Sequence, residues 1–331
     1  MRAIPQRFAA ILGALVATIV IAACGSKSAE NQAATSAGSA SRRAASQGNA
    51  TAEEVAAEAR GDVECPAKIE SQSRAANAPV DDVVGVRPGM TYEEAAYTVL
   101  CTDQLMVVSA PLSSGINMKT YGQTVRQGFT ARLAEPRVQK SSKQIMQEMQ
   151  DDMMARSGNR VVRDMQPGQS KWSVSTMGLP GQERVIHAAR EEWFEADRNP
   201  LIANVEQALI EKYGTPTKQQ HSSGLTYLTW AYDPLGRRIT ETSRLFNQCS
   251  PALDPDGGTN YSPDCGLVIG AFISPLKSNP QLAEFMQAGV INQSGGYDLV
   301  VATEQTLQGF EQQRQARQVQ DAAKNADKPQ L

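Results

Sequence analysis

The residue types that most often perform chemistry are scarce in this chain of 331 residues, which has five cysteines and two histidines. His187 and His221 have no Cys, His or Asp near them at metal-ligand spacing, so neither is expected to bind a metal. No Gly-x-Ser-x-Gly motif is present, and the Ser-x-x-Lys match at residues 274–277 lacks the partner motifs of the enzymes that use it. We therefore expect no catalytic residue, no metal and no cofactor.

Oxygen-bearing side chains gather in one loop rich in Pro and Gly, which carries Asp254, Asp256, Asn260 and Asp264. Calcium prefers oxygen ligands of this kind. The glycine spacing departs from that of an EF-hand loop, however, and no glutamate closes the motif. Because Asp, Gly and Pro are also the residues of tight turns, we expect a turn here and keep calcium binding as the alternative.

The N-terminal segment has a different character from the rest of the chain. Arg2 and Arg7 precede an uncharged run over residues 8–23, which is the pattern of a signal peptide. The run is shorter than the roughly 20 apolar residues needed to cross a bilayer. It ends in a segment that resembles the lipobox of bacterial lipoproteins, Ile21-Ala22-Ala23-Cys24-Gly25.

This resemblance implies removal of residues 1–23, a diacylglycerol thioether on Cys24 and an acyl chain such as palmitate on the new N-terminus. Three such chains anchor a protein to a membrane in effect permanently. In the same family, Gly25 in place of an aspartate favours the outer membrane. The alternatives are a plain secretory signal in which Cys24 has no role, and a transmembrane anchor.

The other four cysteines form an even set. Export places them in an oxidising compartment, where disulfides persist. Four cysteines allow three pairings, of which we favour Cys65 with Cys101 and Cys249 with Cys265. The second pair closes a loop of roughly 15 residues, for which chain entropy gives about 3 kcal/mol of stability. Such a loop, with little apolar surface to bury, is expected to need a covalent tie.

Composition divides the chain into segments. Residues 24–62 are rich in Ser, Ala, Gln and Glu and have no apolar period, which predicts a disordered linker in which residues 52–60 form at most a transient helix without a docking site. Residues 306–331 predict a polar helical tail that docks through Leu307 and Phe310. Between them we expect two α+β units, at residues 63–195 and 196–305.

In the first unit, Thr91 and Glu94 have the spacing of a capping box, which predicts a helix that runs to Cys101. Residues 104–109 fit a strand or a further helical turn equally well. Ile145, Met149 and Met153 recur every four residues, which predicts a helix over residues 143–156. We expect these side chains in the core, and an adaptable binding groove is the alternative. Strands are expected at residues 124–133, 171–177 and 183–194.

In the second unit, Asn204 is expected to cap a helix that ends at Gly214. Alternation over residues 227–232, a turn at residues 233–236 and a return over residues 237–242 then predict a hairpin with one aromatic face toward the core. The remaining expectations are a strand at residues 266–273, a helix at residues 282–288 and a strand at residues 297–303.

The two units resemble the small outer-membrane lipoprotein fold of the BamE (SmpA/OmlA) type, in which a helical pair packs on a three-stranded antiparallel sheet. Tandem copies of that fold occur in secreted beta-lactamase inhibitor proteins, whose domains each hold a disulfide. The resemblance implies an α+β protein with one or two helix-on-antiparallel-sheet units and no catalytic residues. The matching positions are Gly89, Met90, Thr91 and Glu94 in the first unit and Tyr213, Gly214, Pro216, Trp230, Tyr232 and Asp233 in the second.

A net charge of -3 provides no basic surface for nucleic acid. We expect an envelope protein that is held in the lipid bilayer by acylated Cys24 and contacts another envelope protein at the periplasmic face of the outer membrane, in a structural or assembly role. Trp230, Tyr232 and Arg237 are the candidate contact residues if they are exposed. The alternative is that Trp230 lies in the core and Arg237 is a solvated charge at the exit of the turn. The alternatives are an extracytoplasmic inhibitor or ligand-binding module and, third, a hydrolase with an unrecognised site.

Overall fold

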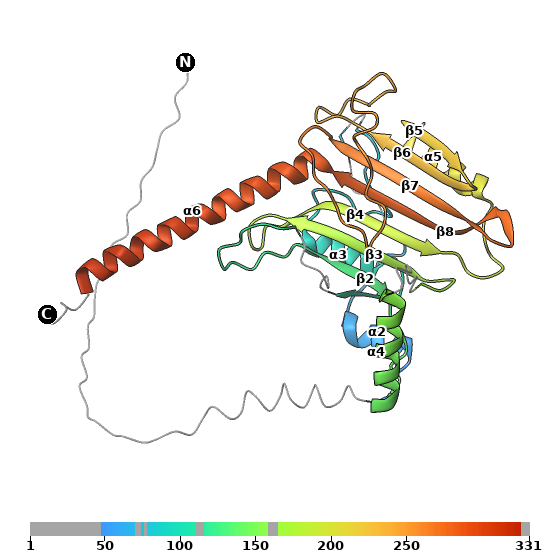
Figure 1. Ribbon diagram of the computed structural model, residues 1–331, viewed down its shortest axis with the longest axis horizontal. Coiled ribbons are helices and arrows are strands. Elements are labelled where there is room, and N and C mark those ends of the chain that lie inside the picture. Colours follow the sequence, from blue (N-terminus) through green and yellow to red (C-terminus); the bar gives the residue numbers. More distant parts are fainter. Residues whose placement is uncertain (1–47, 70–73, 76–77, 110–115, 158–164, 326–331) are drawn as a thin grey trace, which may run out of the picture. The chain divides into compact units, whose positions relative to one another are not determined.

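Eight strands pair into one antiparallel sheet in this computed structural model, which describes residues 48–69, 74–75, 78–109, 116–157 and 165–325. Their spatial order is β1-β2-β3-β4-β8-β7-β6-β5 (Figure 1). The signal segment, Cys24 and most of the linker lie outside the described residues. The strands are β1 (Met106–Ser109), β2 (Gly128–Leu133), β3 (Ser170–Met177), β4 (Arg184–Trp193), β5 (Lys218–Ser222), β6 (Leu225–Ala231), β7 (Leu267–Leu276) and β8 (Asn279–Asn292).

The sheet consists of two halves with the same element order. In the first half, α3 (Tyr92–Leu100) precedes β1 to β4, and in the second half α5 (Ile202–Tyr213) precedes β5 to β8. The last strand of each half, β4 and β8, pair at the centre. The α+β class is therefore confirmed, but the two expected units share one continuous sheet. Each half contributes four strands, and the first half also contains α2 (Ala52–Arg60) and α4 (Ser142–Ser157).

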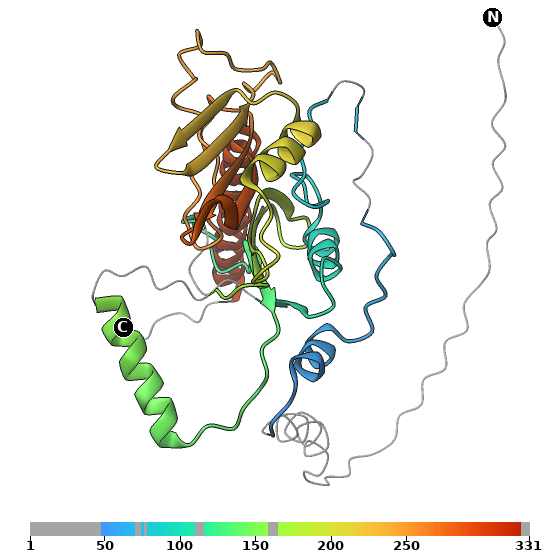
Figure 2. The same ribbon diagram turned by 90° about the vertical axis from the view of Figure 1, so that its right-hand side faces the viewer.

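Both helices cover the same face of the sheet (Figure 2). Alternate residues of a strand point to opposite faces, and the helix-covered face holds the main apolar core, with Trp172, Val174, Ala188, Leu228 and Trp230 among its buried side chains. The two helices begin differently. The capping box of Thr91 and Glu94 is confirmed in α3, whereas α5 begins one turn earlier than expected, after Leu201, with no side-chain cap from Asn204.

Two expectations for residues 282–303 were wrong. Residues 282–288, expected as a helix, belong to β8, because that stretch is paired on one side with β4 and on the other with β7. Residues 297–303, expected as a strand, belong to α6 (Gln293–Asn325). The helical tail is thus longer than expected, and it docks through Leu307, which is buried, while Phe310 is exposed.

After α5, β6 forms a hairpin with β5, which precedes it, and not with the expected return over residues 237–242. The main partners of β6 are β5 and β7, whereas the return over residues 237–242 pairs only at a bridge between Tyr232 and Arg238. The turn itself is present, with the Gly236 N–H donating to the Asp233 carbonyl at 2.9 Å. Residues 104–109, left open between strand and helix, contain β1.

Part of the expected linker is folded. The helix α2 (Ala52–Arg60) has its own capping box and packs against β1 with Ala56 buried. Its last residue, Arg60, donates to the carbonyl oxygens of Leu100, Asp103 and Met106 at 2.7, 2.6 and 3.2 Å. One arginine that reaches carbonyls from the last residue of α3 to the first residue of β1 therefore supplies the docking that the sparse apolar content of this segment did not suggest.

The helix over residues 143–156 is confirmed as α4 (Ser142–Ser157), but its apolar stripe is not in the core. Ile145, Met149 and Met153 are exposed to solvent, and among the described elements none packs closely against α4. Both favoured disulfides are present, with Cα separations of 5.4 Å for Cys65–Cys101 and 5.5 Å for Cys249–Cys265. No described helix is both long and apolar enough to pass through a bilayer.

Candidate binding surface

The face of the sheet opposite α3 and α5 carries a row of small residues. Successive cross-strand partners in this row are Ser173, Ala189, Gly289 and Gly270. A segment that we call the strap, residues 250–256, lies over them. A Cβ atom at Gly289 would collide with the Ala252 carbonyl oxygen, and one at Gly270 would collide with Pro251. The two glycines at the centre of the sheet therefore make room for the strap.

A disulfide and several polar contacts hold the strap over the row of small residues. The Cys249–Cys265 disulfide closes the loop that contains it. Gln293 Nε2 donates to the Ser250 carbonyl at 2.9 Å, and Lys171 Nζ forms an ion pair with Asp256. His187 Nε2 lies 3.2 Å from the Ala252 carbonyl oxygen. Burial lowers the pKa of His187 to about 4, so the ring is neutral at pH 7. Because a carbonyl only accepts, Nε2 carries the ring proton.

Beyond the strap the same face carries aromatic side chains, which we call the aromatic strip: Tyr227 on β6, Phe272 on β7, Phe285 on β8 and Trp193 on β4. Neighbouring ring centroids are 4.9, 5.7 and 4.8 Å apart in that order. Phe285 is buried, Phe272 and Trp193 are partly buried, and Tyr227 is 38% exposed. The strip thus combines a packed base with accessible edges.

Two features border the aromatic strip. On one side is a depression of about 400 Å³, lined by Trp193, Leu225, Ser274, Pro275, Lys277 and Glu284. On the other side is a polar row in which Lys171, Glu191 and Gln287 are successive cross-strand partners.

Glu191 organises the polar row and fixes the edge of the strip. Its carboxylate accepts hydrogen bonds from Trp193 Nε1 at 2.6 Å and Gln287 Nε2 at 2.8 Å, and Lys171 Nζ lies 3.9 Å away. Glu191 and Lys171 are both buried. An unpaired buried charge would destabilise the fold, so the Glu191 carboxylate needs these partners. Its hydrogen bond to Trp193 in turn fixes the position of the indole ring. The arrangement can therefore orient an aromatic ring for binding.

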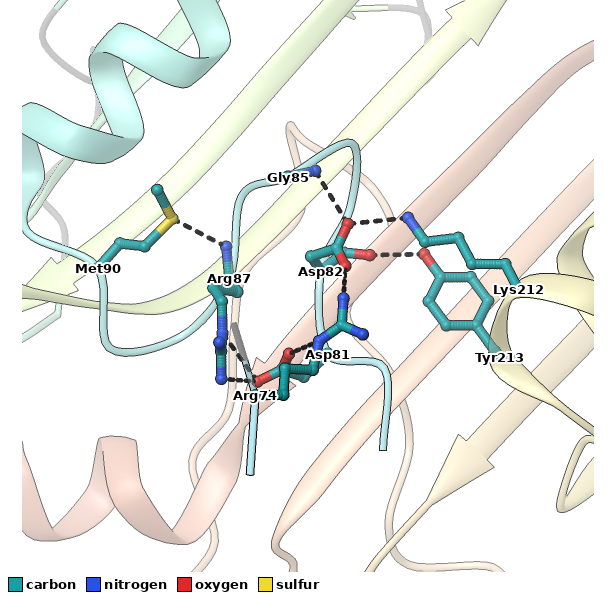
Figure 3. A network of polar contacts seen from close by, with 8 residues as sticks. All are labelled: Arg74, Asp81, Asp82, Gly85, Arg87, Met90, Lys212 and Tyr213. Carbon is teal, nitrogen blue, oxygen red and sulfur yellow. Dashed lines mark hydrogen bonds and ion pairs between the residues drawn. The ribbon is translucent and has the colours of Figure 1, made fainter. Parts of the chain in front are cut away.

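A second polar cluster, shown in Figure 3, surrounds Asp82. Its buried carboxylate accepts from Arg74 at 2.5 Å, Lys212 at 2.9 Å and the Gly85 N–H at 2.9 Å. Tyr213 donates its hydroxyl to the Asp82 carbonyl at 2.7 Å. Burial, reinforced by the nearby Asp82 charge, raises the pKa of Tyr213, so it stays protonated. Because its groups bind one another, this cluster joins the segment before α3 to α5 and serves structure.

The expected contact residues do not form a common surface. Trp230 is only 1% exposed, packs 5.1 Å from the Tyr213 ring and donates Nε1–H to the Gly214 carbonyl at 2.7 Å, so of the two alternatives it has the core position. Tyr232 is partly buried against the main core. Arg237 is exposed, but its guanidinium pairs with Asp233 at 2.7 Å.

The remaining sequence candidates have ordinary surroundings. His221 is exposed and lies 3.1 Å from the Thr226 hydroxyl. In the acidic loop, Asp254 accepts from the Asp256 N–H at 2.9 Å, which is turn geometry, while the Asp256 side chain pairs with Lys171. Within the described part of the chain, no group of three or more His, Cys, Asp or Glu residues could hold a metal ion. Cys24 lies outside that part.

The fold and surface together define an α+β protein with an antiparallel sheet, α3 and α5 on one face and a partly exposed aromatic strip on the other. The chain matches no protein-family model, and no significant match was found among curated proteins or solved structures.

Proposed function

We propose that this protein is exported, anchored in the outer membrane by acylated Cys24, and acts by binding another envelope protein through the aromatic strip. The single observation that carries the binding role is the strip itself. Tyr and Trp are enriched at protein interfaces, where they bury large areas with few rotatable bonds. The proposal assigns the chain a structural or assembly role and no catalytic step.

The construction of the aromatic strip supports a binding role over a purely structural one. Its side chains project from four neighbouring strands of one sheet, so their spacing is set by backbone pairing rather than by loops. Trp193 is further fixed by its hydrogen bond to Glu191. A surface that is ordered before a partner arrives loses little side-chain entropy on binding.

A second candidate function is an extracytoplasmic inhibitor or ligand-binding module. The observation that favours it is the continuity of the sheet, because the strip crosses the β4–β8 junction and so draws on both halves. The two candidates differ in consequence. An inhibitor abolishes the activity of its target when it binds, whereas an assembly protein does not.

Photo-crosslinking in cells tests the binding surface. A photo-reactive phenylalanine analogue at Tyr227, which is 38% exposed, is expected to capture a partner that mass spectrometry identifies. The matched control is the same analogue at Tyr297 on α6, which is 41% exposed and lies outside the strip. Equal capture of the same proteins at both positions would contradict a role for the strip. The identified partner then shows whether its activity is lost in the complex.

Lipid labelling tests the anchor independently. The wild-type chain is expected to incorporate labelled palmitate and to fractionate with outer membranes, while Cys24→Ala is expected to lose the label and the membrane association. A Cys65→Ala variant controls for nonspecific loss of label through misfolding, because it keeps the lipobox. Normal labelling of the Cys24→Ala protein would overturn the anchor and leave the crosslinking result untouched.

A further inference from the structure

One exposed face of helix α4 consists mostly of methionine side chains. Met146, Met149 and Met153 are 67%, 56% and 60% exposed, and Ile145, on the same side, is 48% exposed. Four of the eleven methionines of the chain lie within residues 146–154. Exposed large apolar side chains lower solubility, and no other described element packs closely against α4, so their presence in this number calls for a physical reason.

Helix geometry brings the three sulfur atoms within reach of one another. At 3.6 residues per turn, positions 146, 149 and 153 fall within an arc of about 60°. Met149 is three residues after Met146 and four before Met153, and both separations make side chains direct neighbours on a helix surface. Methionine is unbranched with three rotatable bonds, so the outer two thioethers can lean toward the central one.

The donor set selects the kind of ligand. Thioether sulfur is a soft, neutral donor that favours Cu(I), whereas calcium and magnesium require oxygen and zinc prefers imidazole or thiolate. The nearest described carboxylate on the helix, that of Glu148, is engaged by Lys140 at 2.6 Å. From these observations we infer that Met146, Met149 and Met153 form a three-sulfur site on α4 for one soft monovalent cation, Cu(I) or its analogue Ag(I).

The alternative explanation for the exposed methionines is that they pack against an apolar surface of another protein or helix. Packing against a protein or another helix depends on apolar area, which leucine supplies as well as methionine. Metal binding depends on sulfur and is lost with leucine. Replacing Met146, Met149 and Met153 by leucine therefore separates the two explanations while it preserves helix propensity and the apolar face.

Silver titration of the full chain, with both disulfides formed, tests the site. Every sample carries Cys24→Ser, because a free thiol would bind the same ion. The methionine methyl groups are carbon-13 labelled and followed by NMR. We expect one Ag(I) to shift the methyl signals of Met146, Met149 and Met153, and Cu(I) to compete for the same site. In the triple leucine variant the affinity should fall by roughly tenfold or more, since changes to groups that merely orient metal ligands already cost about that much.

Two controls make the result decisive. Ile145→Ala removes an apolar side chain from the same face without removing sulfur and should leave the affinity unchanged, and circular dichroism checks that the triple leucine variant keeps its helix. The inference is overturned if the triple leucine variant binds Ag(I) as tightly as the parent chain, or if bound Ag(I) leaves the three methyl signals unmoved.

Discussion

His187 is a residue whose role in the structure differs from the usual roles of histidine. It is fully buried between β4 and the strap, and its only close polar partners in the described structure are the Ala252 carbonyl oxygen and, at 3.5 Å, the Ser175 hydroxyl. A neutral imidazole suits this site because Nε2 has a carbonyl to bind and burial disfavours a positive charge on the ring. The residue therefore contributes a hydrogen bond to the strap and a sensitivity to acid.

This sensitivity has a defined direction. The pKa of His187 is lowered from 6.5 to about 4 in the folded protein, so the unfolded chain binds more protons between these values. The stabilisation is complete above pH 6.5 and is lost as the pH falls toward 4, by a total of about 3 kcal/mol. We expect His187→Gln, which keeps a donor for Ala252, to lose this part of the pH dependence.

Urea unfolding of both proteins at several pH values between about 4 and 7 measures the effect. As the pH falls from about 7 to about 4, the unfolding free energy of the wild type should decrease relative to that of the variant. Parallel profiles would show that His187 is not the group responsible. The wild type at neutral pH serves as the reference for any change caused by the substitution itself.

At the scale of elements, short-range signals were reliable where local chemistry decides. The capping box at Thr91 and Glu94 predicts the start of α3 correctly, because both partners lie within one turn. The stretch at residues 282–288 misleads, since its helix-like pattern is overruled by pairing with strands on both sides. The exposure of Ile145, Met149 and Met153 on α4 could not be predicted either. Their spacing shows that they share one face of the helix but not whether another element covers that face.

The candidate surface was predictable only in part. Alternation in β6 separates Tyr227 from Leu228 and Trp230, so the side of the sheet on which Tyr227 lies could be read from the sequence. Its neighbours in the strip come from strands that pair across a long stretch of chain, and the register that stacks Trp193 on Phe285 follows from no local pattern. Sequence reasoning consequently named Tyr227 only as part of an alternating strand and did not single it out as a contact residue.

The fit of the strap to β8 depends on the absence of a side chain at Gly289. We expect Gly289→Ala to lower the free energy of unfolding by about 1–3 kcal/mol, because the new methyl group meets the backbone of Ala252, which cannot rotate away. Urea unfolding measures the loss. Gly258→Ala, in the same disulfide loop and with open space around it, is the matched control and should change stability by less than about 0.5 kcal/mol. Equal losses in both variants would contradict the close fit.

For the molecule as a whole, continuity of the sheet predicts that the two halves unfold together. They share the β4–β8 pairing and the Asp82 cluster. Trp172 and Trp230, both in the core, report on the first and second halves respectively. Two variants that each keep one of these tryptophans, with the other and Trp193 changed to phenylalanine, isolate the two signals.

In each variant, tryptophan fluorescence and far-ultraviolet circular dichroism should give the same denaturant midpoint, as in a two-state transition. The comparison is made within one variant, so a change in stability caused by the substitutions does not affect it. A fluorescence midpoint that departs from the circular dichroism midpoint would show that the halves are separate folding domains.

The central position of β8 determines when the sheet can be completed. β8 follows all the other described strands in the sequence, yet it supplies the second partner of β4, so β4 has an open edge until β8 is available to pair. An open edge presents unpaired N–H and C=O groups that can recruit strands from other chains. Pairing over such a separation is also slow, because loop-closure entropy is lost before contacts form. Until β8 pairs with β4, the folding chain is therefore exposed to aggregation through the open edge of β4.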